Sequence, residues 1–153
     1  MPMRNGFSLI ELMVVIAIVA ILAMIGVPSY QSMMQRGAIA SQSNAILGFL
    51  QLARSEAATR RLATTVCPSA NQASCSGTDL ARGGIMLQGG AVIKVLPPAV
   101  ASLTSAGSNS VVFNSDGTST AAAAWTVGYS GSSATSKAVS ISISGPATIG
   151  DAP

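Results

Sequence analysis

The chain has 153 residues, of which 49% are hydrophobic and only 8% are charged, far below the roughly 25% charged residues of soluble domains. This composition excludes an ordinary charge-rich globular surface and indicates one small domain with a lipid-exposed segment, or a surface of Ser, Thr, Gly and Ala. The net charge of +3 comes without any dense Lys/Arg run, which favours a few membrane-proximal and helical arginines over nucleic-acid binding.

A short polar stretch with one positive charge, Arg4, precedes an almost unbroken apolar run from Phe7 to Val27. As a helix this run would span roughly 30 Å, the thickness of a bilayer's hydrocarbon core. Arg4 predicts a cytoplasmic N-terminus, so the rest of the chain would lie across the membrane, in an oxidising compartment. A secretory signal is disfavoured because the run continues into Pro28 and a further helical pattern without a small-x-small cleavage site.

Glu11 lies inside this apolar run. A carboxylate in hydrocarbon costs at least a few kcal/mol, so its default interpretation is functional, with a partner. A plain membrane anchor explains the length of the run but not this acid. Cleavage after Gly6 would create a positive α-amino group on Phe7. The Phe7 amine of a neighbouring subunit could then pair with Glu11 and set the axial stagger between packed helices.

The segment GFSLIEL at residues 6–12 resembles the class III signal of type IV pilins and pseudopilins. The resemblance implies that a prepilin peptidase cuts between Gly6 and Phe7 and methylates the new Phe7 amine. It implies as partners other pilin or pseudopilin subunits, an inner-membrane assembly platform and membrane lipid. The family also has a proline where this chain has Pro28, and Gly26 weakens the same turn. We therefore expect a helix kink there rather than a helix end.

Residues 29–62 continue a helical pattern, with one apolar stripe and an i,i+4 ion pair between Glu56 and Arg60. Arg54, Arg60 and Arg61 could form a ligand-binding patch, but a solvated face near the helix end is the favoured interpretation. The stripe consists of Ile39, Ile46, Leu50, Ala53 and Ala57.

Beyond Leu62 the composition shifts towards Gly, Ser, Thr and Val, which predicts strands. In the last of them Val139, Ile141 and Ile143 alternate with serines, and this apolar face should cover the helix stripe. Residues 88–91 and 115–118 carry hairpin turn signals, and Pro97-Pro98 ends a strand. The predicted strands are Ala63–Cys67, Gly84–Gln88, Ala91–Leu96, Ser110–Asn114, Ala123–Tyr129 and Lys137–Ser144.

Cys67 and Cys75 lie in this part of the chain, outside the cytosol by the topology above. A metal site would need more ligands and the chain has no histidine, while a redox pair more often has CxxC spacing. A structural disulfide is therefore favoured over both, with an effect of about 2–3 kcal/mol for so short a loop. Without histidine the usual nucleophile–base pairs are also missing, so we expect no catalytic residues, no metal and no cofactor.

Two further segments narrow the resemblance to the GspH/FimT-type branch of the family. They are the helix end LARSEA at residues 52–57, which leads through two arginines to Cys67, and an F-x-x-x-G hairpin from Phe113 to Gly117. That branch often ends its last strand with Gly-Arg-x-Arg, implicated in DNA binding. Here residues 145–148 read GPAT, without either arginine, so DNA as a partner is in doubt. Arg82, Lys94 and Lys137 remain as scattered surface cations.

We therefore expect an α+β, pilin-like roll: one long N-terminal helix, membrane-spanning in its first half, packed against a C-terminal antiparallel sheet. The expected parts are a leader at 1–6, a transmembrane and assembly helix at 7–28, the second helix half at 29–62 and a periplasmic β-rich domain at 63–153. The expected function is that of a minor type IV pilin of the FimT/FimU kind. A GspH-like pseudopilin of a type II secretion system and a DNA-binding minor pilin are the alternatives.

Overall fold

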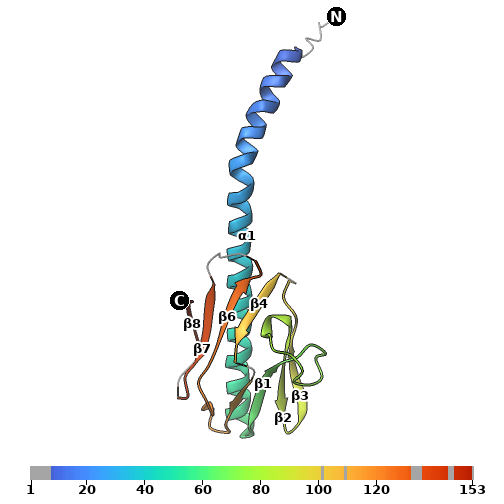
Figure 1. Cartoon of the computed structure of the whole chain (residues 1–153). Coiled ribbons are helices and arrows are strands. Elements are labelled where there is room, and N and C mark those ends of the chain that lie inside the picture. Colours follow the sequence, from blue (N-terminus) through green and yellow to red (C-terminus); the bar gives the residue numbers. More distant parts are fainter. Residues whose placement is uncertain (1–7, 101, 109, 132–135, 145–146, 153) are drawn as a thin grey trace, which may run out of the picture. The chain divides into compact units, whose positions relative to one another are not determined.

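The computed structural model describes residues 8–100, 102–108, 110–131, 136–144 and 147–152. It contains one long helix, α1 (Leu9–Arg60), and then eight strands (Figure 1). The chain divides into two compact units, Met1–Met34 and Gln35–Pro153, and α1 contributes to both. The helix ends where Arg61 takes a left-handed conformation with a φ of 55°. The predicted continuation of the helix past residue 29 is confirmed, and its end lies within two residues of the expected one.

In the second unit the strands form two four-stranded antiparallel sheets. A short 3-10 helix, η1 (Leu80–Arg82), contacts a strand of each sheet. The first sheet has the order β3-β2-β1-β5 and the second the order β4-β6-β7-β8. The strands of the first sheet are β1 (Thr64–Pro68), β2 (Gly84–Gln88), β3 (Ala91–Leu96) and β5 (Val111–Phe113). Those of the second are β4 (Leu103–Gly107), β6 (Ala123–Tyr129), β7 (Lys137–Ile141) and β8 (Ala147–Asp151).

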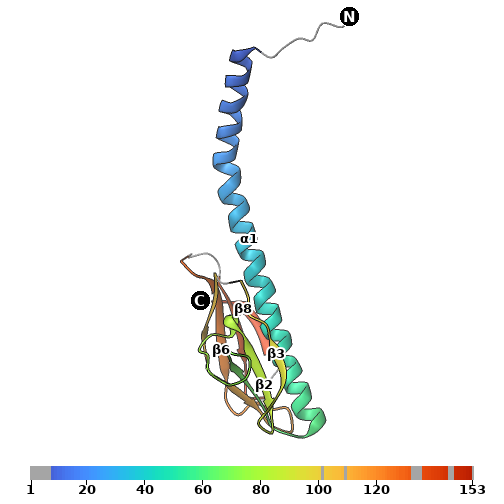
Figure 2. The same cartoon turned by 90° about the vertical axis from the view of Figure 1, so that its right-hand side faces the viewer.

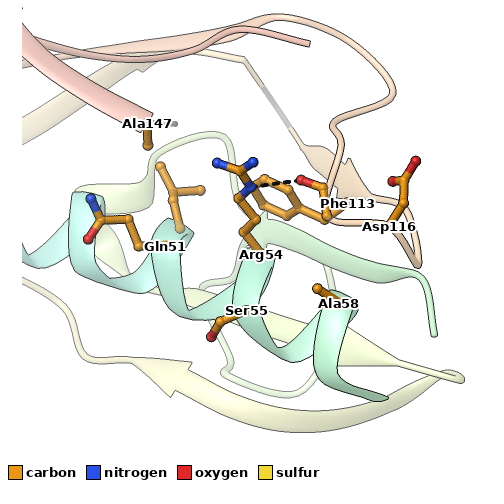
Figure 3. Close-up of a pocket in the computed structure, with 9 residues that line it drawn as sticks. Gln51, Arg54, Ser55, Ala58, Phe113, Asp116 and Ala147 are labelled. Atoms are coloured by element: carbon orange, nitrogen blue, oxygen red, sulfur yellow. Dashed lines mark hydrogen bonds between the residues drawn. The ribbon is translucent and has the colours of Figure 1, made fainter. Parts of the chain in front are cut away.

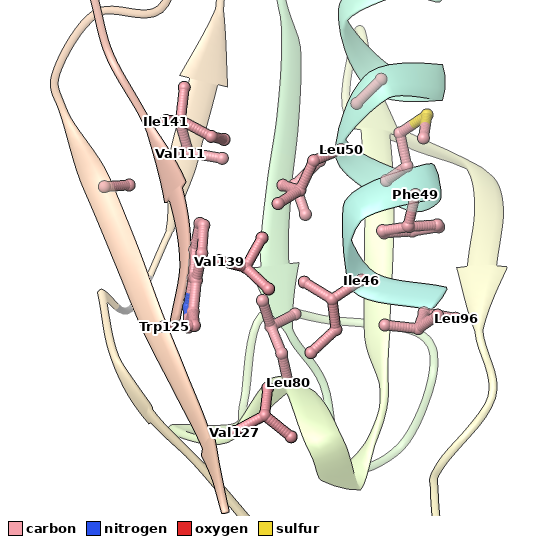
Figure 4. Packing of buried hydrophobic residues seen from close by; sticks show 14 of the residues in the cluster. Ile46, Phe49, Leu50, Leu80, Leu96, Val111, Trp125, Val127, Val139 and Ile141 are labelled. Carbon is pink, nitrogen blue, oxygen red and sulfur yellow. The ribbon is translucent and has the colours of Figure 1, made fainter. Parts of the chain in front are cut away.

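The second-unit part of α1 buries one face among the strands (Figure 2). All five residues of the predicted apolar stripe are buried, and they join one hydrophobic cluster with both sheets. Figure 4 shows Ile46 and Leu50 of α1 together with Val139 and Trp125 of the second sheet. Each such side chain contributes roughly 1.5–3 kcal/mol on burial. The predicted fold class, a long helix with antiparallel strands, is therefore confirmed, although the strands form two sheets rather than one.

The predicted strand boundaries agree with the structure for most of the second unit. Three strands, β2, β3 and β6, have the predicted residues, and β1 and β5 differ by one residue at each end. The turn between β2 and β3 has positive φ at Gly89 and Gly90, as a two-residue hairpin of this kind requires. The hairpin turn after Phe113 is closed by the Asn114 backbone N–H, which donates to the Thr118 carbonyl at 2.8 Å.

The prediction for the last strand is wrong at its end. Strand β7 stops at Ile141, and the Ile143 side chain is 57% exposed rather than buried on the helix stripe. The reason is a further strand, β8, which pairs antiparallel with β7 and places Ala147 opposite Ile141. The chain must therefore reverse direction between these two residues.

The structure joins Cys67 and Cys75 in a disulfide, as predicted, with their Cα atoms 5.5 Å apart. Cys67 is buried on β1, whereas Cys75 lies in the exposed loop that follows. Inside that loop the side-chain carbonyl of Asn71 accepts hydrogen bonds from the backbone N–H groups of Ala73 and Ser74, both at 3.0 Å. The disulfide thus closes a loop that is also ordered by local hydrogen bonds.

Replacing both cysteines, as Cys67→Ser with Cys75→Ser, is expected to lower the free energy of unfolding by about 2–3 kcal/mol, because the open chain gains loop entropy on unfolding. Chemical denaturation of the purified protein measures this loss. The wild type in reductant should unfold at the midpoint of the double variant, and the double variant should not respond to reductant. Equal midpoints for the oxidised wild type and the double variant would contradict the prediction.

Candidate functional site

The first unit presents an apolar helix surface on all sides. From Leu9 to Met34 every large apolar side chain is exposed. In the described part of the chain one helix is long and apolar enough to cross a membrane, judged by its length and composition. A helix that is apolar all round needs lipid or other helices around it, because so much exposed apolar surface is unfavourable in water.

Glu11 lies in the first turn of α1. The helix opens with a hydrogen bond in which the Leu12 backbone N–H donates to the Ser8 carbonyl at 3.1 Å. A carboxylate in this turn interacts favourably with the helix dipole. Ser8 and Glu11 also have the spacing of a capping box, which gives Glu11 a second, local role. Within the described residues, however, no hydrogen bond or ion pair reaches the Glu11 carboxylate.

Gly6 and Phe7, the predicted cleavage and methylation residues, lie outside the described residues. The pairing of the Phe7 amine with Glu11 therefore stays a prediction. In the structure, Glu11 is an exposed carboxylate on an apolar helix, and it has no partner in the described part of its own chain. A charge in that position requires a partner from elsewhere, such as another copy, if the helix is to enter lipid.

Pro28 lies inside α1, and the helix continues past it to Arg60. The alternative of a helix end at Pro28 is therefore wrong. Proline has no backbone N–H, so the carbonyl of Met24 loses its usual helical hydrogen bond, and Gly26 adds conformational freedom in the same turn. A kink at this point stays a prediction.

The two branch-specific motifs, far apart in sequence, meet in the second unit. The Nε atom of Arg54, in the LARSEA segment, donates a hydrogen bond to the Gly117 carbonyl at 2.9 Å (Figure 3). Gly117 has a φ of 81°, a conformation that favours glycine. The prediction that Arg54 belongs to a solvated face is wrong, because Arg54 is half-buried and bonded to the hairpin turn.

The other two arginines of that set behave as predicted. Arg60 is exposed and its Nε lies 2.6 Å from the Glu56 carboxylate, which confirms the i,i+4 pair. Such exposed pairs contribute only about 0.3–0.5 kcal/mol. Arg61 is exposed as well. The helix end is therefore solvated at Arg60 and Arg61, whereas Arg54 is bonded to the hairpin turn.

A cavity of about 420 Å³ lies beside Arg54. Leu50 and Phe113 are among its apolar lining residues, and Gln51, Ser55 and Asp116 among its polar ones. The pKa of Asp116 is lowered, first by the hydrogen bond from the Thr118 hydroxyl and then by that from the Thr118 backbone N–H. The Asp116 carboxylate is therefore ionised at neutral pH.

Elsewhere in the second unit, Asp79 forms a network that no sequence motif indicated. Its Oδ1 accepts hydrogen bonds from the backbone N–H and the hydroxyl of Ser105, at 2.7 and 2.6 Å, and from the Ala81 N–H at 2.8 Å. These contacts tie η1 to β4 of the second sheet. An isolated aspartate in a polar loop carries no sequence signal for such a role.

The cations considered for DNA lie on different elements: Arg82 on η1, Lys94 on β3 and Lys137 on β7. Of the two positions compared with the arginines of the Gly-Arg-x-Arg motif, Pro146 lies outside the described residues, and Thr148 lies on the edge strand β8. Among the described residues, no group of three or more His, Cys, Asp or Glu side chains could hold a metal ion.

Comparison with known proteins gives matches to two family models. A model described as type II transport protein GspH matches residues 42–145, more than half of the chain. A model described as the prokaryotic N-terminal methylation motif matches residues 1–27.

A curated relative matches over a short stretch. Prepilin peptidase-dependent protein D of Escherichia coli (strain K12) is 54% identical over 39 residues, which make up 26% of this chain and 27% of that protein. The match thus spans about a quarter of the length of that relative.

Among solved structures, the type IV minor pilin FimU of Pseudomonas aeruginosa (strain PAO1) has a similar fold. One crystal form aligns with a TM-score of 0.62 and 22% identity, covering 79% of this chain and 92% of that one. A second crystal form gives a TM-score of 0.57, also at 22% identity, covering 74% of this chain and 91% of that one. At this identity the likeness shows the fold alone.

Proposed function

Because this chain belongs to the GspH family of type II transport proteins and has the pilin-like fold, we propose that it is a minor pilin that assembles into, or primes, a type IV pilus. The family consists of structural proteins, not enzymes. In the proposed pathway a prepilin peptidase removes residues 1–6, methylates the Phe7 amine and releases a subunit held in the inner membrane. The β-rich domain then faces the periplasm until an assembly platform adds the subunit to a filament.

The observation that carries this proposal is the state of Glu11. It is a carboxylate on an apolar helix surface, and it has no partner among the described residues of its own chain. Its position inside the methylation motif, as the fifth residue after the predicted cleavage site, supports a partner created by processing, the Phe7 amine of a neighbouring subunit. Lateral packing of the apolar helices would desolvate both charges, so each requires the other.

Processing itself is the direct test. Intact-mass spectrometry of the protein extracted from membranes that contain an active prepilin peptidase should show loss of residues 1–6 and one added methyl group. Cells without the peptidase should yield the full-length, unmethylated chain. A full-length chain in both preparations would sink the proposal, because no Phe7 amine would then exist to meet Glu11.

A second candidate, a pseudopilin of a type II secretion system, is favoured by the description of the matching family model. The fold likeness to FimU favours the pilus instead, but through architecture alone. Both functions use the same processing and the same helix packing. Affinity purification of the tagged chain from detergent extracts separates them: co-purifying pilus subunits support the pilus, and secretion-system subunits support the pseudopilus.

A further inference from the structure

The cavity beside Arg54 has the features of a binding site for a carboxylate group next to an apolar group. It lies in the second unit, between α1, the turn after β5 and the start of β8 (Figure 3). Its apolar lining comes from Leu50, Ala58, Phe113 and Ala147. Phe113 is almost completely buried, so it belongs to the rigid core and not to a mobile surface. Apolar walls with a few placed polar groups are typical of ligand sites.

The polar group placed in this cavity is the Arg54 guanidinium. Its Nε is held by the Gly117 carbonyl, and Figure 3 shows the two terminal nitrogens turned away from that bond and from Asp116. Within the described residues, no hydrogen bond or ion pair uses these terminal nitrogens. The Arg54 guanidinium is half-buried, is fixed in orientation by a hydrogen bond and has free donors. It is therefore preorganised to bind a planar anion such as a carboxylate.

We propose that this cavity receives an acidic side chain with an apolar neighbour, presented by a different subunit of the filament. The inference deepens the proposed function and rests on it, since it names a contact between subunits. Charge supports an acidic partner: Arg4 and Glu11 cancel, so residues 35–153 carry the whole net charge of +3. The ionised Asp116 beside the cavity disfavours a multiply charged ligand such as phosphate, but leaves room for a single carboxylate.

A second copy of this chain is a poor source of that carboxylate. Of the acidic residues in the second unit, Glu56 pairs with Arg60, and Asp79 and Asp116 accept hydrogen bonds from their own chain. Among the described acidic residues of the second unit, only Asp151, on the edge strand β8, has a carboxylate without a hydrogen bond or ion pair. A different subunit with an acidic surface therefore fits the cavity better than a second copy.

The test uses the full-length chain in detergent micelles, labelled with nitrogen-15 arginine. The NMR signals of the Arg54 side chain, assigned by their loss in Arg54→Lys, are followed during titration with two acetylated, amidated tripeptides, Leu-Glu-Phe and Leu-Gln-Phe. We expect a saturable shift with the acidic peptide and binding at least about tenfold weaker with the neutral one. Equal binding of the two peptides, or no saturable shift, overturns the proposal.

A matched pair of variants separates the site from general charge effects. Gln51 lines the cavity three residues before Arg54, so Gln51→Glu places a carboxylate on the same helix face, where it can occupy the guanidinium. We expect it to weaken peptide binding at least about tenfold. Asn44→Glu adds the same charge at another exposed position of α1 and should leave binding within about twofold.

Four outcomes distinguish the possibilities. An unchanged affinity in Gln51→Glu overturns the proposal, as does saturation by sodium acetate at the same concentration as the peptide, which would indicate an adventitious anion site only. A wild-type chain that binds no peptide but is still cleaved and incorporated into filaments refutes the cavity site alone. Peptide binding by a chain that is never cleaved in cells refutes the proposed function and leaves the chemistry of the cavity intact.

Discussion

Replacing Glu11 with alanine is expected to abolish incorporation of the chain into a filament while the second unit stays folded. If Glu11 pairs with a neighbour's Phe7 amine in a desolvated helix bundle, removing the acid leaves that amine buried and unpaired. Breaking a buried ion pair in this way costs about 3–5 kcal/mol, which is at least a hundredfold in association. Immunoblotting of sheared filaments, beside membrane extracts as a measure of expression, detects the loss.

Two further variants make the result specific. Glu11→Gln keeps the size of the side chain and removes only its charge, so it should fail nearly as completely as the alanine variant. Glu56→Ala removes an acid from the second-unit part of the same helix, where the pair with the exposed Arg60 is worth little, and should be incorporated normally. Normal incorporation of Glu11→Gln would show that the charge is dispensable and that the capping-box role of Glu11 is sufficient.

The second large effect is expected at Asp79. Replacing it with alanine removes the acceptor for two backbone N–H groups and one hydroxyl in a mostly buried position. Hydrogen bonds to a charged acceptor contribute about 1.5–3 kcal/mol each, and donors left unsatisfied add to the loss. Because the contributions are not additive, we expect a loss of about 3 kcal/mol in the free energy of unfolding, measured by chemical denaturation.

The controls for Asp79 test charge and position separately. Asp79→Asn keeps one carbonyl oxygen as an acceptor but loses the charge, so an intermediate loss of about 1–2 kcal/mol is expected. Asp116→Ala removes another loop aspartate, which is exposed and accepts hydrogen bonds from nearby Thr118, and should cost less than about 1 kcal/mol. Equal losses for Asp79→Ala and Asp116→Ala would contradict the proposed tie between η1 and β4.

Local signals were sufficient for the elements with strong patterns. The apolar stripe of α1 predicted its buried face, because 3.6-residue periodicity places those side chains on one side whatever packs against them. Strands β2 and β3 were predicted with the correct bounds because the Gly-Gly turn fixes where the chain reverses, although their pairing has a register shift between Met86 and Leu87. Periodicity and turn chemistry are properties of neighbouring residues, which the sequence displays directly.

The strands that were missed lack such signals. Strand β4, with the sequence LTSAG, and β8, with ATIGD, are short, polar and rich in small residues, and each lies at an edge of the second sheet. Their extended conformation comes from pairing with a neighbouring strand. Strand β4 pairs with β6 and β8 pairs with β7, and these two partners were predicted from patterns of their own. Strand propensity depends on such neighbours, so these segments could not be identified alone.

By itself, the sequence determined the apolar helix, the acid within it, the family resemblance and the cysteine pair, because each depends on residue type and on spacing along the chain. Only the tertiary structure decided that Arg54 bonds to Gly117, that Asp79 joins η1 to β4, and that the strands form two sheets. These contacts join residues far apart in the chain. The partner of a polar side chain cannot be predicted from its neighbours in the sequence, because only folding brings the two residues together.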